Sequence, residues 1–169
     1  RLAFWHPCGF HRHAGQNDGL RNFWDRQFLP QCGRGGGIGG HAWDDFIVDA
    51  IGAQAAFPKR QVVSFSGDGG FAMLMGDLLT LRQEKLPVKI VIFNNGTLGF
   101  VEMEMKAAGY VETGVALENP DFAAMANAIG IFGVRVEDPG DLAEGVERVL
   151  SHKGPALLDC VTARNELSM

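Results

Sequence analysis

The feature that most constrains the fold of this sequence is a regular alternation of apolar strands and helices after residue 41. Two short apolar runs, QVVSFS and VKIVIFNN, predict buried strands, and the second is rich in β-branched residues. Because strands and helices alternate along the chain, we expect an α/β fold with a parallel sheet and helices on both faces. The predicted strands are residues 61–66, 88–95, 132–136 and 155–163.

The predicted helices carry apolar residues at spacings of three and four, or recognisable start and stop signals. The first has one apolar face made by Trp43, Phe46, Ile47, Ala50, Ile51 and Ala55, and Pro58 ends it. For a later helix, Asn119 is a candidate cap, Pro120 suits the first turn and Gly130 can end it. The remaining helices are predicted over residues 71–84, 98–107 and 138–154.

Composition narrows the class of protein. With 169 residues, 46% hydrophobic and 21% charged, the chain can form one globular domain, and a net charge of −5 argues against nucleic-acid binding.

Three scattered cysteines are too few for a disulfide framework, which favours a reducing, intracellular setting, and Cys160 is expected to be a buried, inert thiol. No apolar run reaches the ~20 residues of a membrane span, and no signal peptide is recognisable. Because the chain starts at Arg1, we expect a fragment.

Residues 1–40 differ in character from the rest of the chain. All three tryptophans and four of the five histidines lie within the first 43 residues, without helical or strand periodicity. We therefore predict an atypical segment over 1–40, whose hypothesised origin is foreign or out-of-frame coding sequence, and a domain over 41–169.

Polar residues follow two consecutive predicted strands. Gly67-Asp68-Gly69-Gly70 ends the first, and Asn94-Asn95 ends the second. Ligands of parallel α/β sheets bind at the carboxyl ends of the strands, and glycines let backbone N–H groups approach a phosphate. Asp68 repels a phosphate unless a divalent cation lies between them, and Asn95 offers an amide oxygen to the same cation. The residues predict a Mg²⁺-diphosphate site.

A Gly-Asp-Gly followed some 25 residues later by Asn-Asn resembles the signature of thiamine-diphosphate-dependent enzymes. The sequence from Gly67 to Tyr110 looks like the pyruvate oxidases, especially the bacterial quinone-linked pyruvate dehydrogenases, and the resemblance covers roughly residues 50–167. It implies the thiamine-diphosphate-binding fold.

The resemblance also implies roles for single residues. Asp68 and Asn95 would ligate Mg²⁺ through their side chains, and Thr97 through its backbone carbonyl. Phe100 would lie beside the substrate; the alternative is a core aromatic on the helix over 98–107. The implied cofactor-binding residues are Asp68, Gly69, Gly70, Asn95, Gly96, Thr97, Leu98, Gly99, Phe100 and Val101.

As for activity, the resemblance implies that the whole enzyme decarboxylates a 2-oxo acid oxidatively, with electrons passing through FAD to a quinone. Pyruvate is the expected substrate and acetate the expected product. Thiamine diphosphate and Mg²⁺ would bind here, whereas the pyrimidine-binding domain with its glutamate and the flavin domain have no counterpart in this sequence. No catalytic residue is therefore expected in this chain. The resemblance implies a homo-oligomer in the cytoplasm that meets the inner face of the membrane only through an absent tail.

Two alternatives stay open. Acetolactate synthases and related carboligases share the metal motif but have a Gln-Trp pair soon after the Leu-Gly; here LGFVEMEMK places Glu102 and Glu104 there, which favours the oxidases. A non-catalytic remnant is favoured by the missing domains and by residues 41–43 (His-Ala-Trp), where the family has a Gly-Ser-Met type of segment.

Two further motifs lie in the first 40 residues. The glycines at 35, 37 and 40 match G-x-G-x-x-G, but the preceding FLPQC is a poor strand, so we expect no dinucleotide site. HPCGFHRH offers His6, Cys8, His11 and His13, without the second cluster that a zinc site needs.

Overall fold

The computed structural model describes residues 3–5 and 46–164. Several predictions lie outside the described residues: the histidine- and cysteine-bearing stretch at 6–13, the glycine motif at 35–40 and the departure from the family pattern at 41–43.

A five-stranded parallel sheet forms the centre of the domain, with strand order β1-β2-β3-β5-β4. The expected parallel sheet is confirmed, and each predicted strand has a counterpart within two residues at either end. The strands are β1 Ala3–Trp5, β2 Val62–Gly67, β3 Lys89–Asn94, β4 Phe132–Val136 and β5 Ala156–Val161.

Strand β1 was not predicted. It pairs with the outer edge of β2, in the register Phe4 to Val63. A strand of three residues is too short to show a period of two, and the backbone groups of its neighbour determine its pairing.

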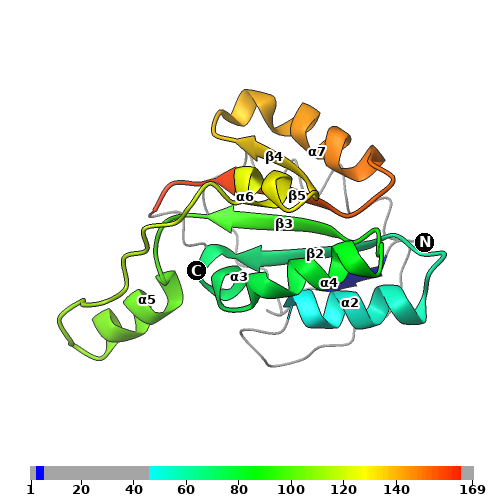
Figure 1. Ribbon diagram of the computed structural model, residues 1–169. Helices are drawn as coiled ribbons and strands as arrows, with labels where there is room; N and C mark the ends of the chain where they lie inside the picture. Colours follow the sequence, from blue (N-terminus) through cyan, green and yellow to red (C-terminus); the bar gives the residue numbers. More distant parts are fainter. Residues whose placement is uncertain (1–2, 6–45, 165–169) are drawn as a thin grey trace.

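Helices lie on both faces of the sheet, as expected (Figure 1). Helices α2, α3, α4 and α6 pack on one face and α7 on the other. The helices are α2 Phe46–Ala56, α3 Asp68–Leu74, α4 Leu78–Gln83, α5 Gly99–Ala107, α6 Phe122–Ala128 and α7 Leu142–Ser151, with 3₁₀ turns η1 Met75–Asp77 and η2 Pro139–Asp141.

The core has two layers because the strands are buried on both sides. In β3, Ile90 and Ile92 face the layer that contains Phe71 and Phe122, whereas Val91 faces the layer under α7. Alternate residues of one apolar run thus enter opposite cores, which is why the run is apolar throughout. Cys160 is buried in the α7 layer as expected, and burial raises the pKa of its thiol to about 12.

Three predicted helix boundaries were wrong. The helix predicted over 71–84 begins at Asp68 and is interrupted by η1, where Gly76 and Asp77 are poor helix formers. The cap of α6 is Asp121, whose Oδ1 accepts the Ala124 N–H at 2.7 Å, so neither Asn119 nor Pro120 is in that helix. The segment predicted as one helix over 138–154 starts with η2. Gly130 ends α6 as predicted, with φ +82°.

Helix α5 stands apart from the rest of the domain. Figure 1 shows it beyond the carboxyl ends of the strands, joined to the sheet by the two segments that flank it. Among the residues that the structure describes, none of the helices combines the length and the apolar character that crossing a bilayer requires.

Candidate functional site

The two polar motifs meet at one edge of the sheet. Strands β2 and β3 are parallel neighbours, and Gly67 at the end of β2 is in register with Phe93 near the end of β3. Asp68 and Asn95 therefore leave adjacent strands at the same edge, close to where α5 begins (Figure 1).

Asp68 is the centre of this site. Its side chain is buried, with 2% of the residue exposed, and its carboxylate accepts three hydrogen bonds. Oδ1 accepts the Gly69 N–H at 2.9 Å, while Oδ2 accepts the Gly96 N–H at 2.7 Å and an Nδ2 proton of Asn119 at 2.7 Å. One carboxylate thus joins the start of α3 to the loop after β3 and to the segment before α6.

The loop after β3 folds tightly around its own polar groups. Asn95 Oδ1 accepts the Thr97 N–H at 3.1 Å, and Gly96 between them has φ +69°, a conformation that glycine adopts without steric cost. Thr97 is buried, and its hydroxyl donates to Glu102 Oε2 at 2.8 Å and lies 3.1 Å from the Val115 carbonyl oxygen. The loop that holds two predicted metal ligands is therefore fixed by contacts on both sides.

Glu102 anchors α5 to this loop. A hydrogen bond from Lys106, at 2.7 Å, and then the one from Thr97 lower the pKa of the Glu102 carboxyl to about 2. Arg164 lies 3.6 Å from Oε2. The negative charge is thus matched by two cations and a hydroxyl, and the start of α5 is held where the predicted cofactor contacts begin.

Residues 115–119 return to the site from α5. Leu98 N–H donates to the Val115 carbonyl at 2.8 Å, and Leu117 N–H to the Gly96 carbonyl at 2.9 Å. Asn119 then reaches both strand ends, with Nδ2 2.7 Å from Asp68 Oδ2 and 2.9 Å from Asn94 Oδ1. This role of Asn119 was not predicted, because the sequence pattern around it is also that of a helix cap; the available signal was Asp121, a second and sufficient cap two residues on.

Gly69, the residue after Asp68, lies against the loop that follows β3. A Cβ atom on Gly69 would lie 2.4 Å from Leu98 Cδ2, at the tip of the leucine side chain, so glycine lets Leu98 pack closely on the first turn of α3. Gly70, half-buried, follows in the same turn.

The remaining predicted residues lie on α5. Gly99 is buried, but Phe100 is 46% exposed and Val101 45%. The alternative that Phe100 is a core aromatic of this chain is therefore wrong. Phe100 is instead exposed, in the first turn of α5.

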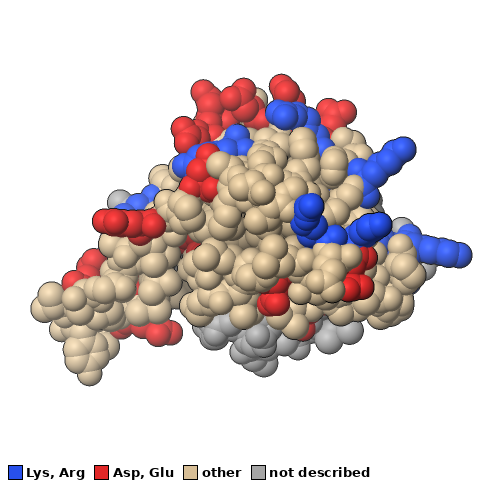
Figure 2. Space-filling view, in the orientation of Figure 1, with Lys and Arg blue, Asp and Glu red and all other residues tan. Residues whose placement is uncertain are grey.

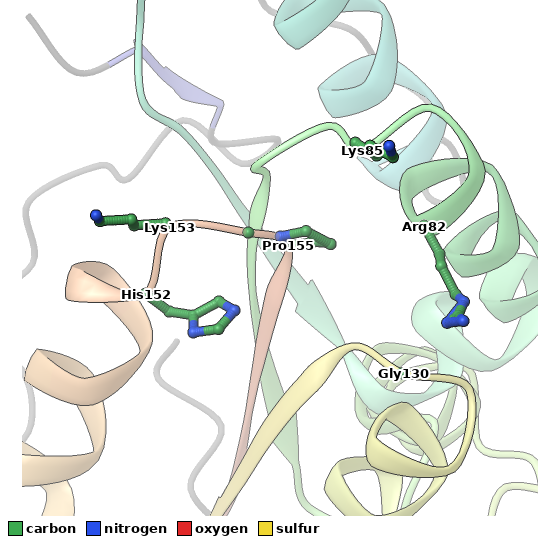
Figure 3. Close-up of a pocket in the computed structure, with 7 residues that line it drawn as sticks. Arg82, Lys85, Gly130, His152, Lys153 and Pro155 are labelled. Carbon is green, nitrogen blue, oxygen red and sulfur yellow. The ribbon is translucent and has the colours of Figure 1, made fainter.

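The structure has a cavity of about 530 Å³ at the opposite end of the strands, and none of the predicted residues lines it (Figure 3). Figure 2 shows basic side chains at this end of the molecule, whereas acidic ones gather over α7 and around α5. The lining residues are Arg82, Lys85, Gly130, His152, Lys153, Gly154 and Pro155.

Two cations at this end of the molecule, Arg82 in the lining and Lys89 beside it, bind backbone carbonyls at or near the ends of helices. Arg82 donates to the Ile129 carbonyl at 2.8 Å, and the buried Lys89 donates to the carbonyls of His152 and Gly154 at 2.6 and 2.5 Å. Helix C-termini carry partial negative charge that such side chains complement. In Figure 3 the Lys153 side chain points away from Arg82, so the basic groups do not converge on one point. Among the lining side chains, Arg82 thus has a helix-capping role.

Within residues 3–5 and 46–164, no group of three His, Cys, Asp or Glu side chains is placed to hold a metal ion. The ligand groups that the sequence predicts at the strand ends are the Asp68 carboxylate, the Asn95 side-chain amide and the Thr97 backbone carbonyl. That set suits a hard cation that keeps several waters, and it lacks the nitrogen and sulfur ligands that zinc takes.

Comparison with known proteins identifies a family. Residues 14–160 match the family described as "Thiamine pyrophosphate enzyme, C-terminal TPP binding domain". The large subunit of acetolactate synthase from Cyanidium caldarium is 35% identical over 155 residues, which cover 88% of this chain and 26% of that protein. The putative thiamine pyrophosphate-containing protein YdaP of Bacillus subtilis (strain 168) is 38% identical over 113 residues, covering 67% of this chain and 20% of YdaP.

A solved structure is also similar. The thiamine diphosphate-dependent 4-hydroxybenzoylformate decarboxylase of Rhodococcus jostii RHA1 superposes with a TM-score of 0.65 at 34% identity, covering 70% of this chain and 23% of the decarboxylase. This chain thus spans about a quarter or less of these three proteins. The family match starts at residue 14, and the foreign origin of residues 1–40 stays a prediction. The match over most of the sequence shows that this chain belongs to the thiamine pyrophosphate enzymes and carries their C-terminal TPP-binding domain.

Proposed function

We propose that this chain supplies the magnesium- and diphosphate-binding half of the active site of an enzyme that decarboxylates a 2-oxo acid. The observation that carries the proposal is the hydrogen bond of 2.7 Å between Asp68 and the Gly96 N–H. It joins the two motifs across adjacent strand ends, so that a carboxylate and an amide-bearing loop share one site.

The groups present fit a Mg²⁺ ion and a diphosphate. Asp68, the Asn95 amide and the Thr97 carbonyl form an oxygen-only ligand set, which Mg²⁺ prefers and usually completes with phosphate oxygens and water. Asn95 Oδ1 accepts one hydrogen bond and has a second lone pair to offer. Gly69 and Gly70 present backbone without side chains at the start of α3.

In this proposal the residues bind and orient the cofactor. Asp68, Asn95 and Thr97 hold the cation, Gly69 and Gly70 lie against the diphosphate, and the segment from Gly96 to Val101 wraps around it. Thiamine diphosphate, when bound, supplies a site that takes up the electron pair left by loss of CO₂. Phe100, exposed at the start of α5, would lie beside the substrate.

Two reactions are candidates for the specific activity of the whole enzyme, and a different observation supports each. The acetolactate synthases among the relatives favour a carboligase, in which the two-carbon fragment joins a second 2-oxo acid. Glu102 and Glu104, where acetolactate synthases have Gln-Trp, favour the pyruvate oxidase type with FAD and a quinone. The similarity to the acetolactate synthases extends over most of the chain, whereas Glu102 and Glu104 are only two positions. We therefore propose the carboligase reaction first.

Calorimetric titration of this chain with thiamine diphosphate, with and without Mg²⁺, tests the proposal. We expect Mg²⁺-dependent binding in the wild type and none in Asp68→Ala. Binding that is equal in both proteins, or absent from the wild type, would refute it; a wild type that binds nothing would favour the non-catalytic remnant.

To distinguish the two reactions, the experiment needs a protein that joins this domain to the pyrimidine-binding domain. Such a protein, given pyruvate, should form acetolactate without an electron acceptor if it is a carboligase. Acetate formation that requires FAD and an acceptor dye would instead support the oxidase. Pyruvate as substrate, assembly into a homo-oligomer and a cytoplasmic location are proposals tied to this assignment.

A further inference from the structure

The hydrogen bonds around Asp68 leave its two oxygens in different situations. Oδ2 accepts from both the Gly96 N–H and the Asn119 amide, so both of its lone pairs are used. Oδ1 accepts from the Gly69 N–H alone and has one lone pair left. Oδ1 is therefore the oxygen that Asp68 can offer to a cation.

Asn119 is itself held in one orientation. Its two Nδ2 protons go to Asp68 Oδ2 and Asn94 Oδ1, at 2.7 and 2.9 Å, and both of these atoms are acceptors. A flipped amide would direct its oxygen at two acceptors. The contact partners thus determine which end of the amide faces Asp68.

A buried chain of hydrogen bonds continues from Asn119 into the sheet. Asn94 Nδ2 donates to Asp159 Oδ1 at 3.0 Å, and Asp159, with no exposed surface, accepts from the Phe122 N–H at 3.2 Å and from Arg135 at 2.6 Å. Asp68 is therefore connected, through two asparagines, to an ion pair that joins β4 and β5.

We propose that Asn119 is a positioning residue for the metal: it occupies Asp68 Oδ2 and so turns Oδ1 toward the cation as a single-oxygen ligand. This inference rests on the proposed function, because it concerns how the same site binds Mg²⁺. It adds a residue to which the resemblance assigned no role in the site, and it excludes bidentate binding by Asp68.

The test compares Asn119→Ala with a matched control, Asn127→Ala. Asn127 lies on α6 and makes two hydrogen bonds of 3.0 Å with Gly133, so its truncation also removes two side-chain bonds but leaves Asp68 untouched. The apparent Kd for Mg²⁺ is measured by calorimetry with thiamine diphosphate in excess, and thermal unfolding verifies that each variant is folded. A purely structural role would lower the unfolding temperature without changing this Kd.

We expect Asn119→Ala to weaken Mg²⁺ binding about 10- to 100-fold, the usual effect of removing an outer partner of a metal ligand, and Asn127→Ala to stay near the wild-type value. If Asn119→Ala does not fold, Asn119→Leu keeps a similar volume, removes the donors without adding a charge and should weaken binding to a similar degree. Wild-type affinity in either folded Asn119 variant would overturn the inference while leaving the proposed function intact. No binding by the wild type would overturn both.

Discussion

The hydroxyl of Thr97 donates a hydrogen bond of 2.8 Å to Oε2 of Glu102, five residues further along the chain. Both residues are buried, so this bond fixes the loop after β3 to the first turn of α5 away from competing water. The loop that bears the predicted metal ligands and the helix that bears Phe100 are thereby held as one unit.

We expect Thr97→Val to lower the free energy of unfolding by about 1–3 kcal/mol, because valine keeps the shape of threonine but leaves the buried Glu102 oxygen without its donor. Urea unfolding measures the change. Thr80→Val, on the exposed side of α4, is the control and should change the free energy of unfolding by less than about 0.5 kcal/mol. Equal effects of the two substitutions would show that the bond contributes nothing.

Gly69→Ala should destabilise the protein by about 1–3 kcal/mol, the usual cost of overpacking. Its new Cβ would lie 2.4 Å from Leu98 Cδ2, so the Leu98 side chain must move from its present packing. Gly76→Ala, where the structure shows no atom within 4 Å, is the matched glycine control in the same urea experiment. Combining Gly69→Ala with Leu98→Ala should recover part of the loss that the clash causes, and a double variant that is strictly additive would argue against this contact.

Removing the partner of the buried Asp159 should be costly. Arg135→Met removes the cation that pairs with Asp159, whose carboxylate has no exposed surface. We expect the free energy of unfolding to fall by about 3 kcal/mol, the lower end for a broken buried pair, because Arg135 is partly exposed. Arg148→Met breaks an exposed pair with Glu144 at 3.9 Å and should cost at most about 1 kcal/mol. Denaturant unfolding of both variants compares them directly, and a similar loss in the two would contradict the difference in burial.

The buried Lys89 should make stability rise with pH above about 8. Burial lowers the pKa of Lys89 from 10.5 to about 8 in the folded protein. Between these values the unfolded chain binds more protons than the folded one, so the free energy of unfolding increases with pH. Below pH 8 both states are protonated and the cost of burying the ammonium group is constant.

The measurement compares urea unfolding of wild type and Lys89→Met on both sides of pH 8. The free energy of unfolding should rise with pH above about 8 in the wild type and should not rise in Lys89→Met. Cys160 acts in the opposite direction, because its thiol has a raised pKa of about 12 in the fold, so both proteins carry Cys160→Ala. Identical pH profiles for the two proteins would refute the assigned role of Lys89.

The local pattern of the sequence was enough to predict the α/β class and the positions of the main strands along the chain. The runs over 61–66 and 88–95 are apolar because both faces of β2 and β3 are buried, and that property is visible residue by residue. Since the carboxyl ends of parallel neighbours meet, the placement of Asp68 beside the loop of Asn95 followed from the same pattern.

Only the tertiary structure decided what holds that site together. The Asn119 amide reaches Asp68 across 51 residues, and it does so because the chain returns from α5 along the Gly96 loop, a path with no periodic signal in the sequence. The tertiary structure also decided the pairing of β1 with β2, the exposure of Phe100 and the packing of Leu98 against Gly69. Periodicity records whether a side chain is buried, whereas these contacts depend on which distant segment does the burying.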